Sequence, residues 1–148
     1  MEQPIDFEAH YRKIAELKEE SKESAESSLK KIKESLADIL RTYDEIKNNP
    51  RFFEFYHEWL DDTDYECYQA FEVDQINTDN FRAVADSLEK IIPDAVATIG
   101  VGDQQKNDLT FDFRGYIGSH FGTVLDQIED TKKILEAFSR RKDDTKTV

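Results

Sequence analysis

Cysteine and long apolar runs are scarce in this chain of 148 residues. Cys67 is the only cysteine, so no disulfide can form within the chain, which is typical of a protein in a reducing compartment. No stretch approaches about 18 uninterrupted apolar residues, and no apolar signal segment follows Met1. These absences favour a cytoplasmic protein that is neither secreted nor embedded in a membrane.

Lys and Arg are missing from thirty consecutive positions, 52–81, which nevertheless carry nine carboxylates and nine aromatic side chains. The net charge of −13 is concentrated nearby, because residues 49–112 contain fifteen acidic and only four basic side chains. Solvated surfaces normally mix both signs, since unrelieved like charges repel. The negative field opposes nucleic-acid phosphates and anionic lipid and favours a basic protein as partner. Solubility alone is the alternative explanation of the average charge.

Proline and glycine are also absent between residues 5 and 49, which predicts one long helix, or two collinear ones, over 5–47. The spacing of three and four in its second half is that of a coiled-coil stripe, formed by Leu29, Ile32, Leu36, Ile39, Tyr43 and Ile46. This stripe leaves open a homodimer, or a structural subunit that assembles through the N-terminal helix. Residues 1–28 are out of phase with it and are expected to form a protruding helical arm or an ordinary helix with a frayed start.

Further helices are predicted from their start and stop signals. Asn49 and Pro50 suit the cap and first residue of a helix over 50–61. The capping-box pattern of residues 63–66 predicts another helix to about residue 76. An amphipathic pattern predicts a helix over 79–92, which Pro93 should break or kink before a short turn to Ala97.

All five glycines lie between residues 100 and 122, which predicts that this is the least helical part of the chain. Residues 100–108 are expected to form a loop, and 109–113 a short strand or a helical turn. A last helix is expected over 123–140, followed by a frayed polar tail at 143–148. The prediction is therefore a single all-α domain over 1–148, an irregular bundle of four to six helices with a long, coiled-coil-like N-terminal helix.

The helix expected over 50–61 places Phe52, Phe55, Tyr56 and Trp59 on one face and leaves Phe53 off it. Either both faces are buried, or one presents aromatic anchors inside an acidic rim. Our first hypothesis is a non-enzymatic binding module, of the inhibitor, immunity-protein, antitoxin or nucleic-acid-mimic type, that docks on a basic protein surface. Phe53, Trp59 and Tyr65 are its candidate anchors. Its candidate partner-binding residues are Glu54, Glu58, Trp59, Asp61, Asp62, Asp64, Tyr65 and Glu66.

Metal and cofactor motifs are incomplete. Glu54 and His57 form one E-x-x-H pair, but a di-iron bundle needs a second, which the sequence lacks. The alternating acids 62, 64 and 66 resemble the start of a calcium loop, yet Cys67 replaces the required Gly and Val73 the required Glu. No glycine-rich phosphate loop followed by Lys and Ser or Thr is present. We therefore predict neither metal nor cofactor.

Arg114 and His120 form an R-x5-H pattern late in the predicted all-helical chain. This resembles the R-x(4–6)-H motif of the HEPN family, helical ribonucleases and related nucleotide-handling domains. The resemblance covers about ten residues of the 148 and departs from the family at Gly115, where Asn is common. It implies a dimer in which Arg114 positions the scissile phosphate and His120 acts as acid and base. A ribonuclease, or its inactive relative, is the alternative function.

Overall fold

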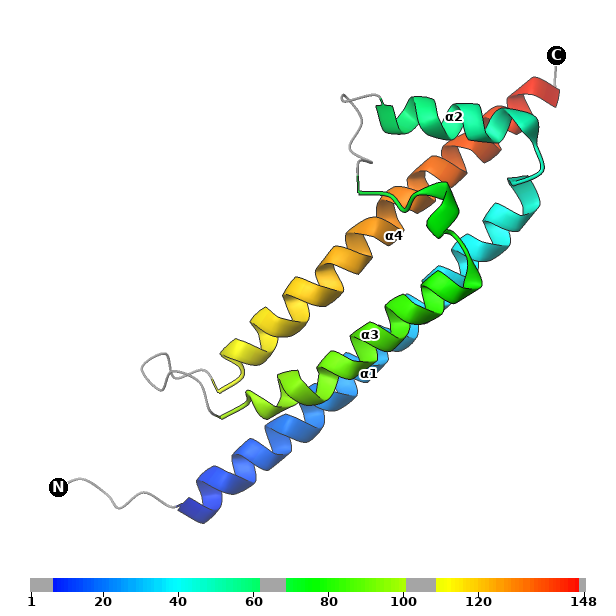
Figure 1. Ribbon diagram of the computed structural model, residues 1–148. Helices are drawn as coiled ribbons and strands as arrows, with labels where there is room; N and C mark the ends of the chain where they lie inside the picture. The colour runs from blue at the N-terminus through cyan, green and yellow to red at the C-terminus, as the bar shows by residue number, and fades with distance from the viewer. Residues whose placement is uncertain (1–6, 62–68, 101–108, 147–148) are drawn as a thin grey trace.

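The computed structural model describes residues 7–61, 69–100 and 109–146, and these contain four α-helices, one short 3-10 helix and no strand. The all-α prediction is confirmed. The elements in chain order are α1 (Phe7–Ile46), α2 (Pro50–Asp61), η1 (Val73–Gln75), α3 (Thr78–Ala97) and α4 (Phe111–Lys146). Figure 1 shows an elongated bundle in which α1, α3 and α4 run along the long axis while α2 packs near the C-terminal end of α4. None of the described helices has an apolar stretch that could span a bilayer.

Helix α1 covers the stretch that the absence of proline and glycine predicted. Its stripe is buried inside the chain, where α1 packs against both α3 and α4. The buried side chains of α1 are Ala25, Leu29, Ile32, Leu36, Ile39 and Ile46. The start of the helix is different, because Phe7 and Tyr11 are 61% and 66% exposed.

Pro93 is expected from the sequence to break or kink a helix over 79–92, but it lies inside α3, which continues to Ala97 in place of the expected turn. Its N-terminus is capped by Asn77, whose side-chain oxygen accepts a hydrogen bond of 2.7 Å from the backbone N–H of Asn80. Pro93 is exposed, while Ile92 and Ala95 on either side of it are buried. Packing of these neighbours against the core outweighs the backbone hydrogen bond that proline removes.

Helix α4 corrects a second expectation, that residues 100–122 are the least helical part of the chain, in the described part of that range after residue 108. The helix begins at Phe111, runs through Gly115, Gly118 and Gly122 without interruption, and extends past residue 140 to Lys146. A glycine inside a helix costs about 1 kcal/mol relative to alanine, which weakens but does not break it. The opposite face supplies the compensation, because Phe113, Phe121, Val124 and Ile128 are buried at helical spacing.

Among the glycines that the structure describes, Gly100 is the one whose backbone conformation requires glycine. Its φ of +83° lies in the left-handed region, and a Cβ added there would stand 2.9 Å from Cδ1 of Ile14. The N–H of Gly100 donates a 2.9 Å hydrogen bond to the carbonyl of Leu109. This bond ties the C-terminal end of α3 to the chain just before α4.

Candidate functional site

The start of α2 is set by the predicted cap. The side-chain oxygen of Asn49 accepts a 3.0 Å hydrogen bond from the backbone N–H of Arg51, and its carbonyl accepts one from Phe52. Pro50 is the first helical residue, where its missing N–H costs nothing. Fixing the first residue of α2 also fixes which of its side chains face the core.

The inner face of α2 is fastened by a cluster of aromatic rings. Phe52 and Tyr56 are completely buried and Phe55 is 7% exposed. The ring of Phe138 from α4 lies 5.3 Å from that of Phe52 and 5.4 Å from that of Phe55, and Tyr43 of α1 lies 5.7 Å from Phe52. Such pairs contribute about 0.5–1.5 kcal/mol each beyond the burial of their area. The cluster therefore holds α2 against both long helices.

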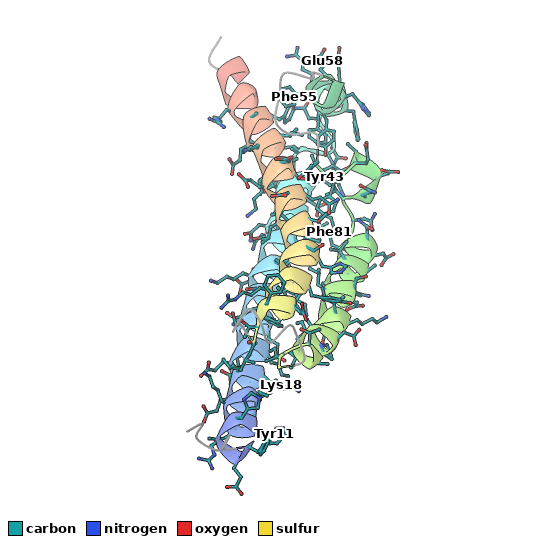
Figure 2. The ribbon with its side chains drawn as sticks, turned by 90° about the vertical axis from the view of Figure 1, so that its left-hand side faces the viewer. Tyr11, Lys18, Tyr43, Phe55, Glu58 and Phe81 are labelled. Atoms are coloured by element: carbon teal, nitrogen blue, oxygen red, sulfur yellow. The ribbon has the colours of Figure 1, made fainter. Side chains whose placement is uncertain are left out.

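The outer face of α2 carries Phe53, Glu54, His57 and Glu58, and all four side chains are exposed. Figure 2 shows Phe55 on the side of α2 that faces α4 and Glu58 at the outer end of the molecule. Phe53 is 41% exposed and leans on Phe52, with 5.5 Å between their ring centres. We call these four residues the α2 outer face. It consists of an accessible ring, Phe53, followed along the helix by the carboxylates of Glu54 and Glu58.

The two carboxylates of this face are one helical turn apart, which places their Cβ atoms about 5–6 Å from each other. No described basic side chain lies within 4.0 Å of Glu54 or Glu58. On α1, by contrast, the hydrogen bond and the charge of Asp44 raise the pKa of Lys47, whose ammonium is 2.7 Å from that carboxylate. The carboxylates of the α2 outer face thus repel each other, and neither forms an ion pair with a described basic side chain.

Hydrogen bonds hold the chain against α4 a second time, at residues 69–71. The carboxylate of Asp130 accepts one of 3.2 Å from the N–H of Gln69, and the hydroxyl of Thr131 accepts one of 2.9 Å from the N–H of Phe71. The hydroxyl of Tyr56 donates to the carbonyl of Phe71. Asp130 and Thr131 belong to α4 and are 8% and 0% exposed. Residues 62–68 are therefore flanked on both sides by backbone that is attached to α4.

These bonds also explain why the predicted helix to residue 76 is wrong in its described part. Residues 69–76 contain only the 3-10 helix η1. The backbone groups of Gln69 and Phe71 bond to side chains of α4 and α2, so they are not used in a helical ladder. Further along, the side chain of Gln75 accepts a 2.9 Å hydrogen bond from the N–H of Glu72. Sequence analysis missed Thr131 and Asp130, because side chains sixty residues away in the chain leave no local pattern.

The structure locates only part of the predicted partner-binding set. Glu54 and Glu58 are exposed on α2. Three further acids that follow α2 in the chain are also exposed, namely Glu72, Asp74 and Asp79. Trp59 and Asp61 belong to the backbone of α2, but their side chains lie outside the described part. The same is true of the whole of Asp62, Asp64, Tyr65 and Glu66. Of the three candidate anchors, Phe53 alone has a described side chain.

Arg114 and His120 lie on the first turns of α4, at the end of the bundle away from α2 (Figure 1). Both side chains are exposed, and the ring of His120 lies 5.1 Å from that of Tyr116 at a tilt of 49°. Six helical residues correspond to about 120° around the axis and about 9 Å along it. One copy of the chain therefore points the two side chains in different directions.

No group of three or more His, Cys, Asp or Glu side chains in the described part is arranged to hold a metal ion. Glu54 and His57, the E-x-x-H pair, both face solvent. The chain matches no known family, no curated protein and no solved structure.

Proposed function

We propose that the protein is a binding module that docks on a basic protein surface. The proposed surface is the α2 outer face together with the acidic segment after it, which contains Asp61, Asp62, Asp64 and Glu66. The observation that carries this proposal is an accessible phenylalanine, Phe53, followed on the same helix by two exposed carboxylates, Glu54 and Glu58, that form no ion pair with a described basic side chain. Exposed aromatic rings contribute most when a partner covers them, and surrounding charges set the speed and specificity of encounter. Inhibitors, immunity proteins and nucleic-acid mimics use this combination.

The way α2 is held supports the same proposal. A partner must order any mobile group that it binds, and this lowers affinity. Here the rings of Phe52 and Phe138 and the bonds of Thr131 hold the surface in the free protein. The carboxylates are therefore presented before a partner arrives, which reduces the entropy that binding must overcome.

The test is a capture experiment with matched variants. A tagged protein is incubated with lysate of the source cells and eluted with rising salt, because the screening length falls from about 10 Å at 0.1 M to about 3 Å at 1 M. We expect a basic protein that the double variant Glu54→Gln, Glu58→Gln no longer retains. The control is Glu16→Gln with Glu20→Gln, an exposed pair with the same spacing on α1. Equal retention by both double variants would refute the proposal.

Phe53→Ala separates the ring from the charges. Because Phe53 is 41% exposed, its removal should disturb the fold less than removal of a buried ring, and it should speed dissociation of the captured partner. The two Glu→Gln changes should instead slow association. Identical kinetics for wild type and Phe53→Ala would remove the ring from the proposed site.

A ribonuclease that uses Arg114 and His120 is the second candidate. Both side chains are exposed near the start of a helix, as the resemblance to the HEPN family requires. Their separation around α4 means that two copies must combine to bring an Arg and a His to one phosphate. RNA cleavage that disappears in His120→Ala would favour this candidate, and equal cleavage by both proteins would dismiss it.

Assembly through the Leu29–Ile46 stripe is the least favoured candidate. Its aliphatic side chains are 1–5% exposed within the chain, so a partner helix could reach them only by displacing α3 or α4. Sedimentation at high protein concentration tests it directly. A dimer that persists when Phe111 and Leu125 are changed to polar residues would bring it back, because these exposed side chains offer the easier contact.

A further inference from the structure

A groove of about 480 Å³ lies between α1 and α3, at the end of the bundle away from α2. Figure 1 shows the two helices running in opposite directions here, and Figure 2 places Lys18 on α1 near the C-terminal end of α3. The floor is apolar and comes from α3, with side chains of Ile92, Pro93, Val96 and Ala97. Its volume falls within the range of about 300–1,000 Å³ that is typical of small-molecule sites.

The charged walls of the groove are arranged by sign. Lys18 and Lys22 line it at the end near Ala97, while Glu26 and Glu89 line the other end. Glu89 already has a cation, since the ammonium of Lys33 lies 4.0 Å from its carboxylate. Within the described residues, neither Lys18 nor Lys22 has a carboxylate within 4.0 Å of its ammonium.

Lys18 and Lys22 therefore lie beside the apolar floor of the groove without an ion pair among the described residues. The combination of a cationic end and an apolar floor suits a ligand with one anionic end and an apolar body. The net charge of −13 repels polyanions at long range, which favours a single carboxylate over a polyphosphate. Eight helical residues separate Lys18 from Glu26, about 12 Å along the axis, and this limits the apolar body to a medium length.

We propose that this groove binds a medium-chain fatty acid, with its carboxylate at Lys18 and Lys22 and its alkyl chain over Ile92 and Val96. The site is independent of the α2 outer face, and the two lie at opposite ends of the bundle. The alternative role of these lysines is structural, since their aliphatic stems cover apolar surface whether or not a ligand is present. The experiment must separate the two roles.

Titration with carboxyl-labelled hexanoate, octanoate and decanoate, below their micelle concentrations, provides the first measurement. The proposal predicts a saturable carboxylate shift and amide shifts confined to residues 18–26 and 89–97. Each added methylene that reaches the floor should tighten binding by up to about fourfold. A carboxylate shift that never saturates, or that ignores chain length, would overturn the proposal.

Two variants and two controls complete the test. Lys18→Gln with Lys22→Gln should weaken decanoate binding at least about tenfold, since two charge-assisted contacts are lost. Lys30→Gln with Lys31→Gln makes the same charge change outside the groove and should leave the affinity unchanged. Equal loss in both double variants would mean diffuse charge attraction and would refute the site.

Ala97→Glu places a carboxylate at the apolar floor and should abolish binding, while Ala97→Ser should keep most of it. Ala97 is exposed at the end of α3, so both variants should fold. Unfolding midpoints of all variants identify any loss of binding that comes from loss of structure. Undiminished decanoate binding by a folded Ala97→Glu protein would contradict the proposed position of the ligand.

Discussion

The two halves of the exposed surface differ in how they mix charge. On α1 acidic and basic side chains alternate, and neighbours form ion pairs such as Asp38 with Arg41 and Asp44 with Lys47. From residue 52 to residue 81 there is no Lys or Arg, and Glu54 and Glu58 face solvent one turn apart. A charge that served only solubility would not need this separation. The contrast is consistent with the proposal of a basic partner, which the variants below test.

The two ends of the bundle also differ in how they are held. At the α2 end, rings from α1, α2 and α4 pack together, and α4 side chains bind the backbone of residues 69–71. At the other end, the first turns of α1 expose Phe7 and Tyr11. A surface that must meet a partner in one geometry benefits from the first arrangement. Four changes sharpen or break this comparison.

Phe52→Ala should have the largest effect. Phe52 is completely buried and contacts the rings of Tyr43 and Phe138, so its removal leaves a cavity that costs about 3–5 kcal/mol of unfolding free energy. Phe53→Ala, the adjacent ring, is the control and should cost less than about 1 kcal/mol because it is 41% exposed. Denaturant unfolding measures both. An equal loss of unfolding free energy in Phe52→Ala and Phe53→Ala would show that the inner face of α2 does not hold the helix more firmly than the outer face.

Thr131→Val tests the polar fastening. The change keeps the shape of the side chain but leaves the N–H of Phe71 without its acceptor, which costs about 1–3 kcal/mol for a buried group. Thr123→Val is the matched control, because both hydroxyls donate to the carbonyl four residues earlier but only that of Thr131 also accepts a bond from Phe71. Hydrogen exchange at Phe71 should accelerate in Thr131→Val alone. Unchanged hydrogen exchange at Phe71 in Thr131→Val would mean that the aromatic cluster holds this part of the chain without the hydrogen bond.

These two fastenings show what the sequence could and could not predict. The long α1, the cap at Asn49 and the buried Phe52 and Tyr56 follow from local rules, namely helix stop signals and apolar spacing. The bonds from Thr131 to Phe71 join residues sixty positions apart, and no local rule contains them. The cluster of acidic residues can be recognised from the sequence as a candidate site. The hydrogen bonds from Asp130 and Thr131 that hold the following residues 69–71 cannot.

The glycines of α4 do not have the effect that glycine content predicts, because α4 runs through them without interruption. Helix propensity disfavours each of them, but the apolar spacing of Phe113, Phe121 and Val124 on the other face decides the outcome. Glycine content alone predicts a weak helix here, whereas the apolar spacing predicts the helix that forms. Pro93 is a similar case, since buried neighbours carry α3 through it.

Gly118→Ala should stabilise the protein, by about 0.5–1 kcal/mol. A Cβ at this exposed helical position meets no atom within 4 Å, and alanine lowers the entropy of the unfolded chain. Gly100→Ala is the contrasting change and should destabilise, because its φ of +83° is strained for alanine and Ile14 is 2.9 Å away. Thermal unfolding gives the sign of each. A destabilising Gly118→Ala would show that the open face of α4 is covered in solution.

Glu58→Lys should have the smallest effect on stability and the most informative effect on binding. It replaces the repulsion with Glu54 by an attractive pair one turn apart, with the acid on the N-terminal side, worth about 0.2–0.5 kcal/mol. The variant should therefore unfold at slightly higher denaturant concentration while it loses the captured partner. Glu20→Lys makes the same charge change in the Glu16 pair on α1 and should keep the partner. A Glu58→Lys protein that is more stable and still binds would show that selection did not keep these carboxylates for recognition, and the contrast between the two surfaces would lose its functional meaning.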